Sequence, residues 1–362
     1  MTETPRVGHD IKLPSPLRSV KGATEDDPLT CLDRTAELGL DGILFRTLPE
    51  LSATLDRGYL RELAARAAER DVYLEVGVGK VNPYMTLELP EIRELGGGSY
   101  LRGMELLVET AAELGWTELW SALAGYKGHL GTMFSNDRYR TDVDWADQLD
   151  ASTRFLAKLA PCLRDCGVHL NLETHEEVTT FELVRIVETI GPDVLGVTLD
   201  TANVVVHGED PLAATARVAP YVRMTHLRDV ALFATEHGLS RYLVPCGEGV
   251  IDWVELLSVL EWAGATPNLT IEQGAGRFQP PMHAYLRDPR WQASHRDVGQ
   301  AEIALLRERA DQYAVRAQAE GLPDLAAFEA RIRDPRDQFT TRSAEHLRAS
   351  LATRASRWAT TR

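Results

Sequence analysis

The chain is poor in cysteine, which limits the kinds of fold that it can adopt. Only four of its 362 residues are cysteine, namely Cys31, Cys162, Cys166 and Cys246. Four cysteines are too few for a disulfide framework in a chain of this length, and the shortage is typical of a reducing compartment. The fold must therefore be held by a buried apolar core, for which a hydrophobic content of 44% is sufficient.

Positive charge and long apolar runs are also scarce. The chain has 39 basic and 54 acidic residues, which gives a net charge of −15 and disfavours binding to a phosphate backbone or an anionic bilayer. It contains no run of 18 apolar residues, and the N-terminal segment MTETPRVGHDIK lacks the basic and apolar regions of a signal peptide. We therefore expect a cytoplasmic protein that binds neither nucleic acid nor membrane.

Short apolar runs alternate with amphipathic helical patterns along most of the chain. Runs typical of strands occupy residues 6–13, 42–47, 72–79, 118–125, 168–175, 195–203, 222–229 and 268–274. Helical patterns occupy residues 28–39, 58–71, 99–115, 146–167, 179–191, 211–222 and 251–264. Eight strands followed by helices predict an α/β fold, a (β/α)₈ TIM barrel. A doubly wound open sheet is the competing fold, but the segment GHDIKLPSP lacks the expected GxGxxG turn.

The residues after the last predicted strand exceed what a minimal barrel needs. We predict that residues 1–278 hold the barrel strands and the catalytic mouth, and that residues 279–362 form a helical C-terminal extension. The helical pattern at 298–321 is expected to be the last outer helix of the barrel. The remainder is apolar at helical spacing, so we expect it to cap the mouth or to join a neighbouring subunit. This predicts a homo-oligomer or a complex with a small partner subunit.

Four polar residues stand at the ends of the last four predicted strands. These residues are Glu173, Asp200, His226 and Glu272, at intervals of 27, 26 and 46 residues. A parallel strand that is buried on both faces should stay apolar to its end, so an acid or imidazole there needs a partner. Three carboxylates and one imidazole suit a hard divalent cation, with Mn²⁺ as our first choice and Mg²⁺ or Co²⁺ as alternatives. Salt bridges with neighbours would explain any one of the four residues alone.

Strand parity tests this metal-site hypothesis. Alternate side chains of a strand share a face, which groups Asn171 with Glu173 and Met224 with His226. In each of the four strands the polar set takes one face and the bulky aliphatic residues take the other. The four candidate ligands are therefore expected to point into the barrel at the carboxyl ends of its strands, where barrel enzymes hold their active sites.

These segments resemble the xylose-isomerase-like TIM barrels, a family that includes sugar phosphate isomerases, ketose 3-epimerases, and inosose isomerases and dehydratases. The matching segments are LNLETH, GVTLDTANVVVHGEDP, THLRDV, VPCGEGVIDW and TIEQG, within residues 6–275. The resemblance implies one metal ion held by Glu173, Asp200, His226 and Glu272. It also implies that Glu173 and Glu272 act as acid and base on opposite faces of a sugar. Some members have histidine three residues after the aspartate, where this chain has Asn203.

The chemistry expected of such a site is abstraction of a proton next to a sugar carbonyl, because a divalent ion stabilises the enediolate that forms. Return of the proton gives a metal-dependent sugar isomerase or epimerase. A lyase on the same site is the alternative: a ketosugar or inosose dehydratase, or a β-eliminating enzyme for 3-oxo-glycosides similar to C-glycoside deglycosidases. A multi-zinc endonuclease of the same fold is disfavoured by Asn203 and by the net charge. A sugar-binding protein without catalysis is a further alternative.

Other polar residues near strand ends are candidates for contacts with a small-molecule carbohydrate. His175 shares the inward face with Glu173, and the GYKGHLG segment is rich in glycine. The predicted substrate-binding residues are His175, Asn203, Arg228, His129, Lys12 and Glu75.

Overall fold

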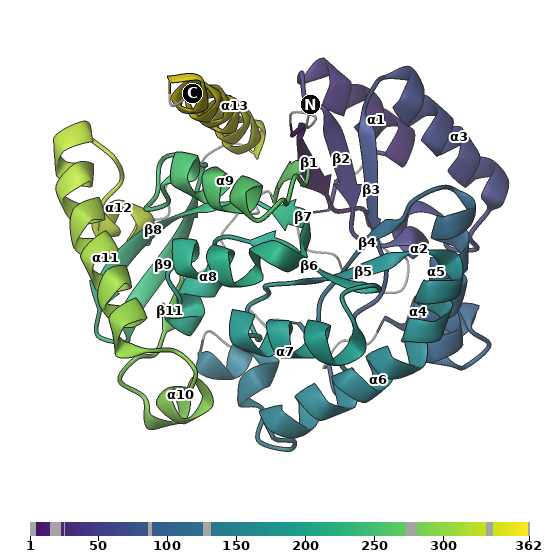
Figure 1. Ribbon diagram of the computed structural model, residues 1–362, viewed down its shortest axis with the longest axis horizontal. Coiled ribbons are helices and arrows are strands. Elements are labelled where there is room, and N and C mark those ends of the chain that lie inside the picture. The colour runs from purple at the N-terminus through teal and green to yellow at the C-terminus, as the bar shows by residue number, and fades with distance from the viewer. Residues whose placement is uncertain are drawn as a thin grey trace.

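The computed structural model describes residues 5–14, 23–24, 26–85, 89–125, 132–272, 281–330 and 336–360, with the backbone alone for 336–337 and 357–360. Within these ranges, eight parallel strands form a barrel with helices around it, and three more strands form a separate sheet (Figure 1). The barrel strands are β1 (Val7–Ile11), β2 (Gly42–Phe45), β3 (Tyr73–Gly77), β4 (Glu118–Ser121), β5 (His169–Glu173), β6 (Leu195–Asp200), β7 (Val222–His226) and β10 (Leu269–Ile271). The predicted α/β barrel is confirmed.

The barrel closes between its last two strands. Strands β1 to β7 pair in chain order, and β10 pairs with β1. Leu227 donates its backbone N–H to the carbonyl of Thr270 at 2.8 Å, and Glu272 donates to the carbonyl of Leu227 at 3.2 Å. Because the strands are parallel, their carboxyl ends and the loops that follow them all lie on one face of the barrel.

The outer helices begin and end where local sequence signals place them. Asp27 accepts hydrogen bonds from the amides of Leu29 and Thr30, and Thr179 forms a capping box with Glu182. The helices that follow β1 to β7 are α1 (Pro28–Glu37), α3 (Arg57–Glu69), α5 (Tyr100–Glu113), α6 (Trp145–Cys166), α7 (Thr180–Ile190), α8 (Pro211–Val218) and α9 (Trp253–Trp262). Among the helices described, none is both long and apolar enough to cross a bilayer.

Shorter helices lie in the connections. These are α2 (Leu48–Leu51), α4 (Pro90–Leu95), α10 (Pro289–Ser294), α12 (Leu325–Glu329) and the 3₁₀ turns η2 (Met133–Ser135), η3 (Asp137–Tyr139), η4 (Val204–His207) and η5 (Ala219–Tyr221). Turns η2, η3 and η4 follow β4 and β6, so they lie on the carboxyl face of the barrel. They supply much of the wall around the site described below.

Apolar side chains pack on both sides of the barrel wall. Residues such as Ile43, Leu170 and Val197 are fully buried in the large core between strands and outer helices. A smaller cluster of Leu44, Trp120, Ala122 and Met224 joins residues of β2, β4 and β7, and therefore lies inside the barrel. Met224 precedes His226 by two residues, so both share the inward face, as strand parity predicts.

A three-stranded antiparallel sheet follows β7. It consists of β8 (Asp229–Thr235), β9 (Gly238–Val244) and β11 (Met282–Ala284), in the order β11–β9–β8. The β8–β9 hairpin was not predicted from the sequence. Neither segment shows a regular alternation of apolar and polar residues. β8 is buried along most of its length against the C-terminal helices, so most of its residues are apolar. The missed hairpin matters because it carries a side chain into the barrel mouth.

The C-terminal helices divide between the two sheets. Helix α11 (Gln300–Glu320) packs on β8, where its Tyr313 and Ala317 join an apolar cluster with Phe233. Helix α13 (Arg336–Thr360) packs instead on α9, β1 and β10 (Figure 1). The prediction that residues 298–321 form the last outer helix is therefore wrong: α13 takes that position. The predicted boundary after residue 278 lies outside the described residues, so that division stays a prediction.

Candidate active site

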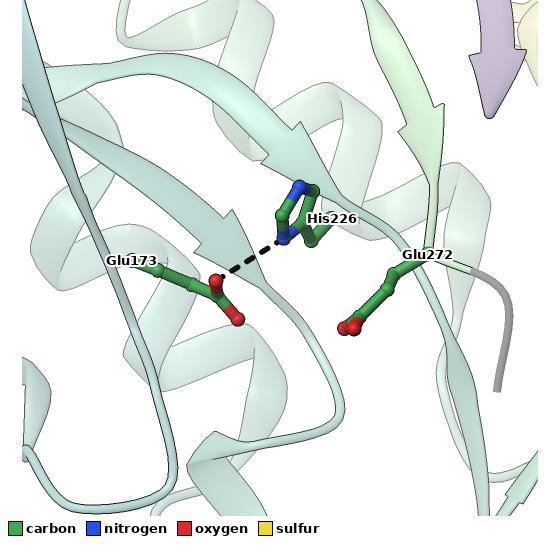
Figure 2. Close-up of side chains that lie close together, drawn as sticks. All are labelled: Glu173, His226 and Glu272. Atoms are coloured by element: carbon green, nitrogen blue, oxygen red, sulfur yellow. Dashed lines mark ion pairs between the residues drawn. The ribbon is translucent and has the colours of Figure 1, made fainter. Parts of the chain in front are cut away.

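Three buried side chains converge at the carboxyl ends of the barrel strands. Glu173 ends β5, His226 ends β7, and Glu272 directly follows β10. One potential ligand atom from each residue lies within 4.8 Å of those of the other two, and the residues are 1%, 0% and 5% exposed. Figure 2 shows the carboxylates of Glu173 and Glu272 on either side of the His226 ring. We call these three residues the triad.

His226 provides a test of whether the triad fits a metal ion. Its Nδ1 lies 3.2 Å from Oε2 of Glu173, as the dashed line in Figure 2 marks. Yet among the described residues neither ring nitrogen has a partner in hydrogen-bond geometry. A fully buried imidazole with two unsatisfied nitrogens is costly, and a bound cation would resolve the cost. The buried Glu/His/Glu set is consistent with a divalent metal.

Glu173 is held by uncharged donors. Its Oε2 accepts a hydrogen bond from Nε1 of Trp120 at 2.8 Å, and its Oε1 accepts one from Nδ2 of Asn203 at 3.3 Å. Burial raises the pKa of Glu173, but the imidazoles of His226 and His175 outweigh burial and lower it to about 2. The Glu173 carboxyl is therefore ionised and oriented.

Glu272 is held by cations. Its Oε1 contacts Nη2 of Arg46 and lies 3.7 Å from Nζ of Lys12, while its Oε2 lies 2.7 Å from Nη2 of Arg228. Burial raises the pKa of Glu272, but these three cations outweigh burial and hold it well below its usual range. Arg46 also pairs with Oδ2 of Asp10 at 2.7 Å.

Asp200, the fourth predicted ligand, lies beside the triad. Its Oδ1 accepts hydrogen bonds from the amides of Ala202 at 2.8 Å and Asn203 at 3.1 Å. Its Oδ2 accepts from Nδ2 of Asn203 at 2.9 Å and pairs with Arg228. The guanidinium of Arg228 therefore bridges Asp200 and Glu272. A role for Asp200 as a metal ligand stays a prediction.

Asn203 connects the acids to two arginines. Its Oδ1 accepts from Nη2 of Arg228 at 3.0 Å and from Nη1 of Arg241 at 2.8 Å. These two donors fix the amide so that its Nδ2 faces Glu173 and Asp200. Arg241 comes from β9, is 2% exposed, and also donates to the carbonyl of Ala202 at 3.0 Å. Through Arg241, the small sheet thus helps to orient Asn203 in the barrel mouth.

His175 lies between two carboxylates that follow it in the chain. Its Nε2 is 3.0 Å from Oε2 of Glu176, and its Nδ1 contacts Oε2 of Glu177. Burial lowers the pKa of His175, but the two carboxylates outweigh burial and hold it well above its usual range. The ring is therefore an imidazolium whose two N–H groups both face carboxylates.

The remaining predicted substrate-binding residues are placed differently. Glu75 accepts hydrogen bonds from Nδ2 of Asn268 at 3.0 Å and Oγ1 of Thr270 at 2.8 Å, one layer below Glu272 in the barrel. Lys12 lies next to Glu272, as described above. His129 lies outside the described residues. Their roles in substrate binding stay predictions.

Four residues of the barrel mouth were not predicted from the sequence. Asp10 and Arg46 also stand where buried strands end, so the same change from apolar to polar could have identified them. Trp120 gave no signal, because a tryptophan in an apolar run is equally expected in a core. Arg241 gave none either, because it depends on a hairpin that was not predicted.

A sequence profile described as xylose isomerase-like TIM barrel matches residues 32–295. The chain belongs to this family. Among curated proteins, the chain is 26% identical over 121 residues to the uncharacterised protein YihM of Escherichia coli K12, covering 33% of this chain and 37% of that protein. It is also 26% identical over 145 residues to inosose dehydratase 1 of Bacillus cereus, covering 35% of this chain and 46% of that enzyme. The matches thus span less than half the length of these relatives.

Solved structures show the same fold at low identity. An L-ribulose 3-epimerase superposes with a TM-score of 0.58 at 16% identity, over 98% of both chains. A xylose isomerase-like TIM barrel protein of Mycobacterium smegmatis, solved in complex with magnesium, superposes with a TM-score of 0.56 at 16% identity, over 85% of this chain and 98% of that one. The IOLI protein with a zinc atom superposes with a TM-score of 0.51 at 16% identity, over 87% and 98%.

Proposed function

We propose that this protein is a divalent-metal-dependent sugar isomerase or epimerase that removes a proton next to a carbonyl group. The observation that carries the proposal is the triad, in which two buried carboxylates flank an imidazole whose nitrogens have no hydrogen-bond partner among the described residues. Membership of a family whose named structures include a 3-epimerase supports it.

Glu173, His226 and Glu272 would hold the cation, with Asp200 as the proposed fourth ligand. Mn²⁺ is the ion that we propose, with Mg²⁺ or Co²⁺ as alternatives, because carboxylate oxygens and one imidazole suit these hard ions. When bound, the ion supplies positive charge that stabilises the negative charge developing on the sugar oxygens as the C–H bond breaks.

The proton would be moved by Glu173 and Glu272. Their low pKa values keep both carboxyls ionised at neutral pH, as a general base requires. They come from β5 and β10, which are separated by β6 and β7, so they approach a bound sugar from different sides (Figure 2). Return of the proton to the opposite face gives epimerisation, and its return to the neighbouring carbon gives isomerisation.

A lyase that uses the same proton abstraction is the second candidate. The name of one relative, inosose dehydratase 1, supports it. In a ketosugar dehydratase or a β-eliminating enzyme for 3-oxo-glycosides, the carbanion formed at the same carbon expels its β-substituent. The substrate in either case is a small-molecule carbohydrate, and the homo-oligomer or partner subunit stays a prediction.

The proposal is tested by hydrogen exchange. The Mn²⁺-loaded protein is incubated in D₂O with ketoses, inososes and 3-oxo-glycosides, and NMR follows deuterium at the carbon next to the carbonyl. We expect exchange without a leaving group for an isomerase or epimerase, and a new double bond or a released group for a lyase. Glu173→Gln and Glu272→Gln should abolish exchange, whereas Glu118→Gln, at the amino end of β4, should not. Exchange that persists in both triad variants would contradict the proposal.

A further inference from the structure

A separate cavity of about 220 Å³ opens at the same end of the barrel as the triad. Its wall comes from segments that follow β4, β5, β6 and β10, so every part of it belongs to the carboxyl face. The described lining residues are Thr132, Met133, Asn136, Tyr139, Glu176, Val206, His207, Pro281, Met282, His283 and Tyr285. An enclosed space of about 150 Å³ is enough for one benzene ring, so this cavity can hold a group of that size.

Arg241 lies between the cavity and the triad. Two lining residues touch it: Glu176, whose Oε1 is 3.8 Å from Nη2, and Met282, whose Sδ is 2.7 Å from Nη2. On its other side Arg241 donates to Asn203, whose amide reaches Glu173. The cavity is therefore two side chains away from a proposed catalytic carboxylate. The cavity and the triad thus share the carboxyl face, with Arg241 and Asn203 between them.

Somewhat more of the cavity wall is apolar than polar. Met133, Val206 and Met282 contribute aliphatic or thioether surface, and Tyr139 and Tyr285 contribute aromatic rings. Thioether and aromatic groups pack well against a flat ring. The same residues belong to the apolar cluster beneath the small sheet, so the wall is supported from behind.

The polar groups of the wall already have partners within the protein. Asn136 accepts from the amide of Arg138 at 2.8 Å and donates to the carbonyl of Glu176. His207 has His295 at 2.9 Å on one ring nitrogen and the carbonyl of His175 at 3.4 Å on the other. A second sugar ring would need a partner for each hydroxyl that it buries, and this wall offers few. An apolar ring needs none.

Charge also limits the ligand. Among the described lining residues there is no lysine or arginine, and the one acid, Glu176, is paired with His175. Burial lowers the pKa of His207 to about 3 and that of His283 to about 4, so both rings are neutral at pH 7. Among these described residues a phosphate or carboxylate group would meet no lysine or arginine, which favours an uncharged substituent.

We propose that this cavity binds an uncharged aromatic ring carried by the substrate, so that the natural substrate is an aryl-substituted sugar rather than a free monosaccharide or a sugar phosphate. The ring-binding half of the proposal rests on the cavity alone. The substrate class rests in addition on the proposed function of the triad.

Binding of a ring without a sugar tests the cavity independently of catalysis. The full-length, metal-free protein is titrated with 4-fluorophenol and followed by ¹⁹F NMR. Val206→Phe should fill the cavity, and Tyr285→Ala should remove an aromatic wall; each should weaken binding at least about tenfold. The matched control is Tyr221→Ala, because Tyr221 lies at the amino end of β7, on the opposite face of the barrel. We expect wild-type affinity for that control.

Two results would overturn the cavity proposal. One is the absence of saturable binding to the folded wild-type protein. The other is binding of 4-fluorophenol with wild-type affinity by both Val206→Phe and Tyr285→Ala. If Val206→Phe does not fold, wild-type affinity of Tyr285→Ala alone overturns the proposal, because Tyr285 is half-buried. Deuterium exchange is measured separately on the Mn²⁺-loaded protein. Ring binding without exchange on any sugar would overturn the function proposed for the triad, while exchange without ring binding would overturn this inference.

Once ring binding in the cavity is confirmed, calorimetry tests the substrate class. It compares the binding of 4-fluorophenyl β-D-glucopyranoside with that of methyl β-D-glucopyranoside. We expect the aryl glycoside to bind at least about tenfold more tightly than the methyl glycoside in the wild type. That preference should disappear in Val206→Phe and persist in Tyr221→Ala. Equal affinity of the wild type for the two glycosides would contradict the proposed substrate class.

Discussion

The two glutamates of the triad stand in opposite surroundings. Glu272 faces Arg46, Arg228 and Lys12, so its carboxylate is held by ion pairs. Glu173 accepts hydrogen bonds from Trp120 and Asn203, and it has His226 at 3.2 Å. The first arrangement surrounds the carboxylate with three lysine and arginine cations, and the second combines two neutral donors with nearby imidazoles. Because desolvated ion pairs are sensitive to the loss of one partner, the two sides of the mouth should respond differently to the same substitution.

The largest difference is expected in stability. Glu272→Gln leaves Arg46, Arg228 and Lys12 with one carboxylate fewer, and should destabilise the metal-free protein by about 3 kcal/mol. Glu173→Gln removes a carboxylate that lies beside two neutral donors and an imidazole rather than three lysine and arginine cations, and should cost about 1–2 kcal/mol. Urea unfolding in EDTA measures both. Equal losses in the two variants would contradict the difference between the two sides.

Double-mutant cycles sharpen the same comparison. The pair Glu272→Gln and Arg46→Met should show a coupling of about 2 kcal/mol in unfolding, because the two groups are buried and oppositely charged. The pair Glu173→Gln and Trp120→Phe should show about 1 kcal/mol, the value of one neutral hydrogen bond. A larger coupling for the Glu173–Trp120 pair than for the Glu272–Arg46 pair would contradict the proposed difference between the two glutamates.

Arg241 contacts the Glu173 side of the mouth through Asn203. Lysine at this position lacks the planar guanidinium that donates to Asn203 and Ala202 from Nη1 while Nη2 faces Glu176, so the Asn203 amide would be held less firmly. We expect Arg241→Lys to lower kcat/KM for exchange about tenfold, with most of the loss in kcat. The control is Arg223→Lys, the one exposed residue of β7. An unchanged kcat in Arg241→Lys would show that Asn203 is held without it.

The smallest predicted effect is the pH dependence contributed by His207, in the cavity beside the Glu173 side. Burial lowers its pKa from 6.5 to about 3, so the unfolded chain takes up a proton before the folded protein does. Its stabilising contribution is therefore fully present above pH 6.5 and is lost as the pH falls towards 3. Between pH 7 and pH 6 the loss should be about 0.7 kcal/mol. Thermal unfolding of His207→Gln should show a shallower slope over this range, and an identical slope would contradict the assignment.

The barrel strands and the triad could be predicted from the sequence because both depend on local patterns. Each barrel strand is a short apolar run, and Glu173, His226 and Glu272 end three of these runs on the inward face. The small sheet and the position of α13 could not be predicted in this way. A helix such as α11 carries an apolar face but no information on which sheet it covers, and that choice depends on long-range contacts such as Tyr313 with Phe233.

The surroundings of the two glutamates were also beyond sequence reasoning. A strand-end arginine such as Arg46 can pair with a neighbour on its own strand or reach across the mouth, and only the closed barrel brings it to Asp10 and Glu272 together. The bridging position of Arg228 between Asp200 and Glu272 likewise depends on the register of β6, β7 and β10. Sequence identifies candidate groups, whereas their ion pairs follow from the fold.

The central claim is that His226 and its two glutamates bind a divalent cation, and calorimetric unfolding with and without Mn²⁺ tests it most directly. At about 100 times the dissociation constant, the ion should stabilise the wild type by about 2.7 kcal/mol and raise its Tm by several degrees. In His226→Gln the Mn²⁺-dependent rise should disappear, while His169→Gln, at the amino end of β5, should keep it. An unchanged wild-type Tm with Mn²⁺, or the same rise in His226→Gln, would contradict the claim.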